Sequence, residues 1–355
     1  MAFSLRTGAV LILAALGTTA SHAHHSSAPH YDRSKPIEIS GVVTRFRFVN
    51  PHAYLYLDVT DENGEVSSWN CEMGAAAALR RSGWTSELFA PGTRVSITGS
   101  AARRDPHGCS FESGTLDDGT LIARNGTITS GGEATVARAE PQSTNSVGDS
   151  NTLAGTWITT PRRRGGRPAG PPGGNPDRFA NMITEAGAAA LANYDMRFDD
   201  PALNCSPSSI IRGWSEPNSV SQIEIDDSSV VIRHEYMDTV RHVDLTTREH
   251  PASITPSLTG HSVGWFEGDT LVIASVGFEA GVLLPHPGLM NSENMQIVER
   301  LTLSDDGSAL IREYVVSDPD FLKTPHTGQS SWTRSDIAIG EYNCTELGGL
   351  NNARQ

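Results

Sequence analysis

The chain has 355 residues, which is enough for two ordinary domains that each have a core of their own. Its 41 acidic residues outnumber the 27 basic ones and give a net charge of −14. Such a surface repels a phosphate backbone, so the composition excludes nucleic acid as a partner.

The N-terminus predicts export. Residues 1–23 have the parts of a signal peptide: a basic residue, Arg6, then an apolar stretch from Ala9 to Leu16, then a small-x-small sequence that ends at Ala23. Cleavage after Ala20 is an alternative. The apolar stretch is too short to cross a bilayer, and no later stretch approaches that length. We therefore expect a periplasmic or secreted protein without a transmembrane anchor.

Four cysteines in an exported protein predict two disulfides. Cys71 and Cys109 lie in the first half of the chain, and Cys205 and Cys344 lie in the second. Of the three pairings that four cysteines allow, we favour the one that keeps each bridge within its half. No pair has the CxxC spacing that is typical of a zinc site.

Residues 24–129 predict a small β-domain. From Ala53 to Thr60, apolar and polar residues alternate with the period of a strand that buries one face. Turn residues separate short strands, and a short helix fits Ala75 to Arg81. The expected strands are 37–48, 53–60, 66–71, 94–99 and 121–123. Five or six short strands with one helix favour a barrel of the OB type.

Several motifs in this half resemble a domain of unknown function found in exported proteobacterial proteins. They lie within residues 24–128 and are His24-His25-Ser26, Tyr31-Asp32, Gly41-Val42-Val43 and Asn50-Pro51-His52. The resemblance implies a small exported β-domain and no established activity.

The start of the mature chain is a candidate metal site. If cleavage follows Ala23, the free amino group and imidazole of His24 form, with a second imidazole, a nitrogen set suited to Cu(II). His25, His30 and His52 are available as the second imidazole. We favour a mobile terminus with solvated histidines, and copper or another transition metal is the alternative.

A second domain follows a linker. Residues 130–150 have the Ser, Thr, Gly, Glu and Asn content of a linker, and the domain spans residues 151–346, with a tail at 347–355. The Pro/Gly/Arg-rich residues 161–176 predict a disordered insertion, and Phe179 to Asn193 predict one amphipathic helix. The expected strands are 221–225, 229–236, 239–245, 260–266, 270–276, 295–303 and 309–316. Their short links favour an antiparallel up-and-down barrel.

Two resemblances accompany this half. Gly155-Thr156-Trp157 is similar to the opening strand of the lipocalins, in which the tryptophan plugs one end of the barrel. Other motifs resemble a large set of uncharacterised exported bacterial proteins: Asn204-Cys205-Ser206-Pro207, Gly260-His261-Ser262, Trp265-Phe266-Glu267-Gly268-Asp269-Thr270-Leu271, Val276-Gly277-Phe278, Glu299-Arg300 and Tyr342-Asn343-Cys344. With the strand pattern of the first domain, they predict a mainly all-β protein in which an OB-like barrel is followed by a lipocalin-like barrel. Neither resemblance implies a particular reaction.

Strand alternation places two charged residues inside the second barrel. Glu299 shares its face with Ile297 and Leu301. Arg241 shares its face with Val243 by the same argument. Because a buried carboxylate and a buried guanidinium are costly to desolvate, we expect them either to form a structural ion pair or to anchor a ligand.

Further residues would complete such a site. The expected lining of a ligand cavity is Glu235, Tyr236, Trp265, Phe266 and Phe278. His261 and His286 are candidate general acid–base groups, because imidazole titrates near neutral pH; a structural or solvated role is the alternative for each.

The leading hypothesis is an exported binding protein for a small, partly apolar molecule in the C-terminal barrel. One alternative is a secreted lyase, isomerase or hydrolase, in which His261 or His286 moves a proton, Arg241 stabilises negative charge and Glu299 assists. A second alternative is an envelope interaction module without a pocket. The sequence has no phosphate-binding loop, dinucleotide fingerprint or HExxH helix, which disfavours nucleotide cofactors and zinc peptidase chemistry.

Overall fold

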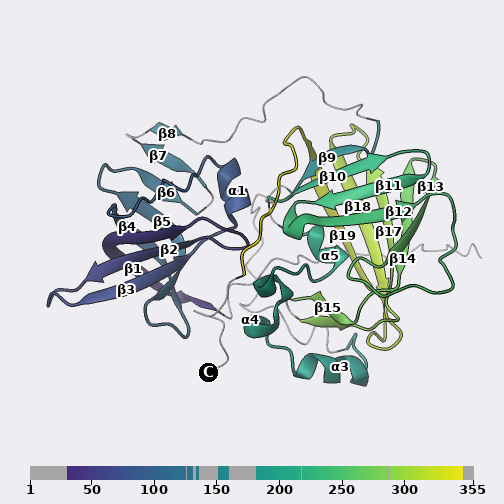
Figure 1. Cartoon of the computed structure of the whole chain (residues 1–355), viewed down its shortest axis with the longest axis horizontal. Helices are drawn as coiled ribbons and strands as arrows, with labels where there is room; N and C mark the ends of the chain where they lie inside the picture. The colour runs from purple at the N-terminus through teal and green to yellow at the C-terminus, as the bar shows by residue number, and fades with distance from the viewer. Residues whose placement is uncertain are drawn as a thin grey trace, which may run out of the picture.

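The computed structural model describes residues 30–124, 126–130, 133–135, 151–159, 181–216, 218–285 and 288–346. Several predicted features lie outside these ranges: the signal peptide, His24, His25, most of the linker, the insertion at 161–176, His286 and the tail at 347–355. Within them, Figure 1 shows two β-rich domains side by side.

The described residues of the N-terminal domain contain eight strands and one helix. They are β1 (Tyr31–Arg47), β2 (Tyr54–Thr60), β3 (Val66–Glu72), α1 (Ala76–Arg81), β4 (Arg94–Ala102), β5 (Gly108–Leu116), β6 (Leu121–Ala123), β7 (Ile128–Ser130) and β8 (Glu133–Thr135). Its core includes Trp84, Phe89 and Phe111, whose rings meet edge to face. Such contacts between aromatic rings add to the stabilisation from their burial.

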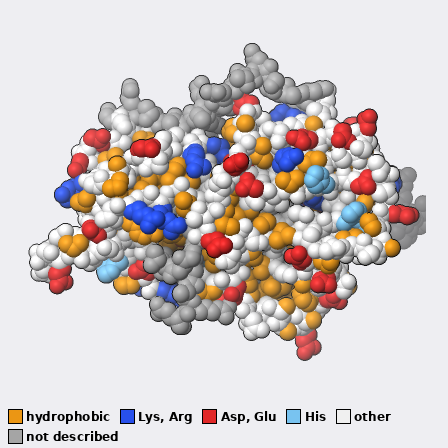
Figure 2. Space-filling view, viewed as in Figure 1, with side chains coloured by type: hydrophobic (Ala, Val, Ile, Leu, Met, Phe, Trp, Pro, Cys, Tyr) orange, Lys and Arg blue, Asp and Glu red, His pale blue; other side chains and the backbone are white. Residues whose placement is uncertain are grey.

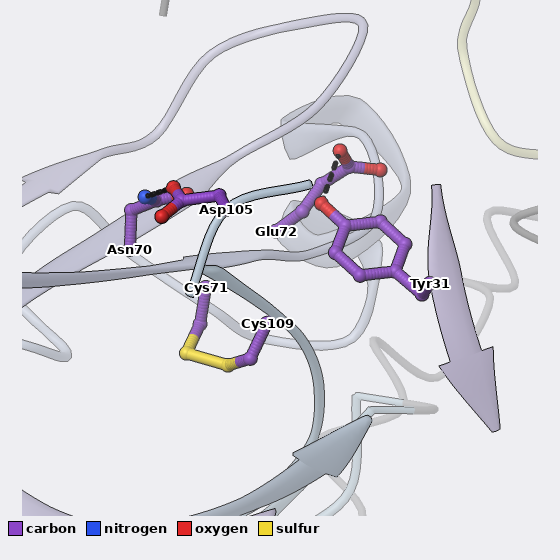
Figure 3. Close-up of a disulfide and its surroundings, with 6 residues drawn as sticks. All are labelled: Tyr31, Asn70, Cys71, Glu72, Asp105 and Cys109. Carbon is purple, nitrogen blue, oxygen red and sulfur yellow. Dashed lines mark hydrogen bonds between the residues drawn. A yellow bond between two sulfur atoms is a disulfide. The ribbon is translucent and has the colours of Figure 1, made fainter. Parts of the chain in front are cut away.

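Five of these strands close into a ring. Their order around the ring is β1-β2-β3-β5-β4, because β3 pairs with β5 as well as with β2, and β4 returns to β1. The β3–β5 pairing is parallel and sets Cys71 opposite Cys109. The two cysteines form a disulfide across this seam (Figure 3). The ring, with α1 following β3, confirms the OB-like barrel.

Two parts of this domain differ from expectation. β5 is not among the strands that the sequence predicts, because small and polar residues interrupt the alternation of its hydrophobic ones. The short strands β7 and β8 extend the sheet to residue 135, within the stretch whose composition predicts a linker. In both places backbone pairing, rather than a hydrophobic pattern, makes the strand.

The C-terminal domain is built on a closed barrel of nine strands, β10-β11-β12-β13-β14-β17-β18-β19-β9. The strands are β9 (Gly155–Ile158), β10 (Val220–Ile225), β11 (Ser229–His234), β12 (Thr239–Asp244), β13 (His261–Glu267), β14 (Thr270–Val276), β17 (Gln296–Leu303), β18 (Ala309–Ser317) and β19 (His326–Ser335). The seven strands that the sequence predicts are all present. β19 is an addition, and together with β9 it closes the barrel.

The barrel is antiparallel except at one pairing. β12 and β13 run parallel, with Val243 opposite Ser262. Residues 245–260 connect the two strands, and β13 then starts beside the last residues of β12 and runs in the same direction. This connection is why the simple up-and-down order expected from the sequence is interrupted here.

Short helices and a hairpin cover one end of the barrel. They are α3 (Glu185–Ala192), α4 (Met196–Asp199), η1 (Pro201–Asn204), α5 (Ile210–Gly213), η2 (Tyr236–Asp238), β15 (Gly281–Leu284) and β16 (Leu289–Asn291). α3 is shorter than the predicted helix, because the Thr184 side chain accepts a hydrogen bond from Gly187 N at 3.0 Å and caps it there. Ser209 caps α5 in the same way and donates to Leu283 O at 2.8 Å, which ties α5 to β15.

The two domains are joined through α1 and the segment that follows β19. In Figure 1 this last segment, yellow, runs between the domains. Asn50 is buried there: its side chain accepts from Ala77 N at 2.9 Å and donates to Tyr342 O. Arg81 of α1 pairs with Glu235 of the barrel domain at 2.7 Å. A second disulfide, Cys205–Cys344, holds the segment to the end of η1, as the sequence predicts.

Acidic side chains are scattered over the face of both domains seen in Figure 2, in keeping with the net charge of −14. In the described ranges, no helix combines the length and the apolar character needed to cross a membrane.

Candidate ligand-binding site

A layer of polar side chains lies inside the closed barrel. Its members are buried and face inward from neighbouring strands: Ser221, His234, Arg241, Ser262, Ser275, Glu299 and Arg312. Two positions along each strand toward one end of the barrel stand apolar residues of one cluster: Ile223, Ile232, Val243, Ile273, Leu301 and Leu310. Toward the other end stand Ile297, Tyr314 and Val316 of a second cluster. The charged groups therefore occupy a slab between two apolar regions.

Three charged side chains form the centre of this layer. Glu299, fully buried, pairs with Arg241 through Oε2 and accepts from Nε of Arg312 through Oε1 at 2.6 Å. Arg241 and Arg312 are only 2 % and 1 % exposed. Two guanidinium groups thus share one carboxylate.

Two serines fix the orientation of Arg241. Its Nε donates to Ser262 Oγ at 2.9 Å and its Nη2 donates to Ser275 Oγ at 2.6 Å. The two hydroxyls lie 2.9 Å apart, so they also hydrogen-bond to each other. Arg241 therefore has hydrogen-bond partners on two sides and Glu299 on a third, which holds its planar fork in one place.

Electrostatics keep Glu299 ionised. Burial raises the pKa of its carboxyl, but Arg241 and Arg312 outweigh that effect and hold the pKa below its ordinary value. Burial lowers the pKa of Arg241, and Glu299 offsets only part of that change. Burial, and then Arg241 and Arg312, lowers the pKa of His234 to about 3. At neutral pH the layer therefore contains two positive charges, one negative charge and a neutral imidazole.

Trp214 enters the layer from the C-terminal end of α5. Its ring meets His234 edge to face at 4.6 Å and lies 4.6 Å from Trp332. The guanidinium of Arg312 lies 5.7 Å from the centre of the Trp214 ring and 4.5 Å from that of Tyr314. Trp214 thus covers the charged groups from the side of α5.

Apart from Nη1 of Arg241, which pairs with Glu299, two donors in this arrangement have no hydrogen-bond partner among the residues that the structure describes. They are Nη2 of Arg312 and Nε1 of Trp214. Both side chains are 1 % exposed. A buried donor without a partner costs free energy, so both groups are suited to a bound acceptor.

Arg241 and Glu299 have the inward orientation that alternation predicts for them, and the structure brings them together. Whether they bind or catalyse stays a prediction. Trp157 is buried in the apolar cluster at one end of the barrel, with its indole donating to Leu153 O at 3.0 Å. This is the place expected from its resemblance to the lipocalin tryptophan.

His261 does not join the charged layer. Its neighbour Ser262 faces inward to Arg241, and successive side chains of a strand point to opposite faces, so His261 lies on the outside. There its Nδ1 is 2.9 Å from Nδ1 of His250. Trp265 shares this outer face, donates to Glu267 Oε1 at 2.9 Å and lies 5.0 Å from the Arg248 guanidinium. Phe266, at the end of the hairpin, is 45 % exposed. The lining expected from Trp265 and Phe266 is thus absent.

The remaining predicted lining residues are dispersed. Phe278 belongs to the apolar cluster beneath α5 and the β15–β16 hairpin. Tyr236 and Glu235 follow the end of β11 and face the N-terminal domain, where Tyr236 packs on Ala77 and Tyr342. Glu235 pairs with Arg81. Both were expected within a strand, but the strand ends at His234, so their side chains leave the barrel.

The N-terminal metal expectation falls mostly outside the described residues, with His24 and His25. His52 lies 3.3 Å from Oε1 of Glu72, while Tyr31 and Tyr54 donate to Oε2 of Glu72 at 2.9 and 3.0 Å. Figure 3 shows the Tyr31 hydroxyl pointing at that carboxylate, close to the Cys71–Cys109 disulfide. Over the ranges that the structure describes, no three or more His, Cys, Asp or Glu side chains gather into a group that could hold a metal.

Sequence reasoning misses Arg312, His234 and Trp214. Arg312 has the same signal as Glu299, because it lies between Leu310 and Tyr314 in a predicted strand. His234 alternates with Ile232 in the same way. Trp214 follows a helix of four residues, for which no periodicity can be read.

A protein family model matches part of the chain. The model of a family described as "Family of unknown function (DUF6152)" matches residues 12–110. The match falls on the N-terminal part, where the His-His-Ser and Asn-Pro-His motifs occur, and its description names no activity. Among curated proteins, none matches the chain.

Proposed function

We propose that the chain is an exported binding protein that holds a small, partly apolar molecule inside the C-terminal barrel. The observation that carries this proposal is the charged layer around Glu299, which lies between two apolar clusters. A few polar anchors within apolar walls are the usual composition of a small-molecule site.

Such a layer is not expected to stabilise a purely structural core. Replacing a buried ion pair by apolar residues of similar volume is often neutral or stabilising, so the pair gives the barrel no clear gain in stability. The network of Arg241, Glu299 and Arg312, with its serine partners, is instead the kind of preorganised set that orients a ligand.

Export is supported by two disulfides, which form and persist in oxidising compartments, and by the signal-like residues 1–23. The alternative of acid–base catalysis has less support, because His261 lies on the outer face of the barrel and the pKa of His234 is lowered to about 3 by burial. A group with so low a pKa is a weak base near neutral pH.

The test is binding of a neutral apolar dye such as Nile red, followed by energy transfer from the barrel tryptophans Trp214 and Trp332. The interior variant Ile232→Trp puts a larger side chain two positions along β11 from His234, and the matched variant Phe266→Ser changes the outer hairpin. We expect the dye to bind the wild type and Phe266→Ser, and Ile232→Trp to lose at least tenfold in affinity. Circular dichroism checks that both variants are folded.

Loss of binding in Phe266→Ser, with Ile232→Trp unaffected, would place the dye on the surface and overturn the proposal. Native mass spectrometry of protein purified from its own source supplies the second readout. We expect a bound organic molecule of fixed mass. A bare chain that also fails to bind the dye would overturn the proposal as well.

A further inference from the structure

We infer that the molecule held in the barrel carries a single carboxylate, and that Arg312 and Trp214 bind it. This inference rests on the proposed function and adds the chemical class of the ligand. It comes from the charge of the layer and from its unpartnered donors, which are independent observations.

The first observation is the charge. Arg241 and Arg312 each contribute one positive charge, Glu299 contributes one negative charge, and His234 is neutral at physiological pH. The charged groups with the largest effect on Glu299 are Arg241 and Arg312, and those with the largest effect on Arg241 are Glu299 and Arg312. The interior therefore holds one uncompensated positive charge at a place where charge is costly. A monoanion restores neutrality there, whereas a dianion would reverse the sign.

The second observation is the pair of free donors. Nη2 of Arg312 and Nε1 of Trp214 are buried and have no partner in the described chain. Both groups can only donate, so the missing partner is an acceptor. The Arg312 guanidinium lies 5.7 Å from the centre of the Trp214 ring. Two donors are the number that the two oxygens of one carboxylate can accept.

The contacts of Arg241 explain why Arg312, and not Arg241, is the group that binds. Arg241 uses Nε and Nη2 on Ser262 and Ser275 and pairs with Glu299 through Nη1. Glu299 in turn holds Nε of Arg312 at 2.6 Å. The serines thus hold Arg241 in place, and Arg241 holds Glu299. Glu299 orients Arg312 through Nε, and Nη2 of Arg312 keeps no partner in the described ranges. Arg241 and Glu299 are positioning residues in this arrangement.

The apolar clusters suit the rest of the ligand. The guanidinium of Arg312 stacks on Tyr314, which belongs to the cluster beneath α5 and the β15–β16 hairpin. On the other side Trp214 belongs to the apolar cluster at the other end of the barrel, the one that contains Trp157. A hydrocarbon chain or ring attached to the carboxylate would therefore meet apolar side chains in either direction.

The experiment compares two probes of equal length, decanoate and decan-1-ol, by isothermal titration calorimetry. The variants are Arg312→Met and the control Arg300→Met, which makes the same change on the outer face of β17. We expect the wild type and Arg300→Met to bind decanoate at least about tenfold more tightly than decan-1-ol, because a hydrogen bond to a charged group distinguishes them. Arg312→Met should bind both equally.

Equal affinity of the wild type for the two probes, or an unchanged preference in Arg312→Met, would overturn the inference and leave the proposed function intact. Decyl phosphate is the third probe. If it binds more tightly than decanoate, the site prefers a dianion and the assignment of a carboxylate is wrong. If the wild type binds none of the probes or Nile red, and native mass spectrometry finds no ligand, the proposed function itself fails.

Discussion

Glu299 is the residue on which the interior of the barrel depends. It is fully buried between two guanidinium groups, each of which relies on it for its ion pair. Removing one partner of a buried ion pair is far more costly than removing both, because a charge is left without compensation. The two arginines and the glutamate therefore differ in what their removal leaves behind.

Glu299→Gln should lower the free energy of unfolding by about 3–5 kcal/mol, because it leaves two positive charges facing each other. Arg312→Met should cost less than about 2 kcal/mol, since a neutral Arg241–Glu299 pair remains. Chemical denaturation of the unliganded proteins measures both values. Equal losses in the two variants would contradict this account of the charge.

His234 predicts a pH dependence of stability. Burial and the two arginines lower its pKa to about 3 in the folded protein, whereas an unperturbed histidine titrates near about 6.5. Between these values the unfolded chain binds the extra proton. The free energy of unfolding should therefore fall as the pH drops below about 6.5, by up to about 1.4 kcal/mol per pH unit, and the contribution of His234 should be constant above it.

The measurement is denaturation between pH 5 and pH 7 for the wild type and for His234→Gln, which keeps a polar group beside Ser221. The free energy of unfolding should change less steeply with pH in the variant, because the variant lacks the one proton that His234 binds on unfolding. Identical slopes would show that His234 is not the group responsible.

The sequence predicts these residues unevenly. A period of two places Arg241 and Glu299 inside the barrel, and the same period applies to Arg312 and His234. The period does not predict which residues on the neighbouring strands lie next to each of them. That Glu299 stands opposite Ile273 on one side and Tyr314 on the other depends on the order of the strands. His261 shows the limit of reasoning from motifs. It stands next to Ser262, whose side chain points into the barrel, so the side chain of His261 points outward.

At the scale of elements, α5 is a cover held in place by close packing. A Cβ added to Gly213 would lie 2.8 Å from Cδ2 of His234, so the helix sits directly on the polar layer. Ser209 ties the other end of the helix to β15. Because Arg312 and Trp214 are almost completely buried, the ligand proposed above would reach them only if α5 or the hairpin moved away. Association should therefore be slow.

Gly213→Ala should destabilise the protein by about 1–3 kcal/mol, because the methyl group pushes α5 off His234. The sign is informative, since the same change in an exposed helix is usually stabilising. Gly281→Ala in β15 is the control, because a Cβ there meets nothing within 4 Å. Thermal unfolding of both variants gives the comparison, and equal shifts in Tm would speak against close packing at Gly213.

Most strands of both domains follow from hydrophobic alternation and turn residues. Those that the sequence misses, β5 and β19, have small or polar residues at several positions and become strands because neighbouring strands offer backbone partners. The predicted helix from residue 179 begins only at Glu185, because Ile183 forms a bridge with Leu322. Tertiary context decided these cases, as expected where local patterns are weak.

At the scale of the whole molecule, the two domains share a polar interface. Arg81 of α1 reaches across to Glu235, whose side chain is 5 % exposed, and donates to Asn218 O. Asn50 lies alongside and binds Ala77 and Tyr342. Such contacts fix the relative orientation of the domains more than they add affinity.

Arg81→Met should weaken the free energy of association between the two domains by about 2–5 kcal/mol, because the Glu235 carboxylate stays buried without its cation. Arg80→Met, on the exposed side of the same helix, is the matched control. Small-angle scattering should show a larger radius of gyration for Arg81→Met alone. Equal radii for both variants would mean that the ion pair does not hold the domains together.

The closure of the barrel sets the order in which the protein can be made. β9 and β19, the first and last strands of the barrel, pair with each other, although more than 160 residues separate their nearest ends. β9 pairs with β10 on its other side. The OB-like ring and its seam disulfide need only residues 31–116 and can form before the C-terminal domain is complete. The barrel interior, by contrast, has no enclosing wall until β19 arrives, and pairing at such sequence distance is slow. During that interval the charged layer is open to solvent.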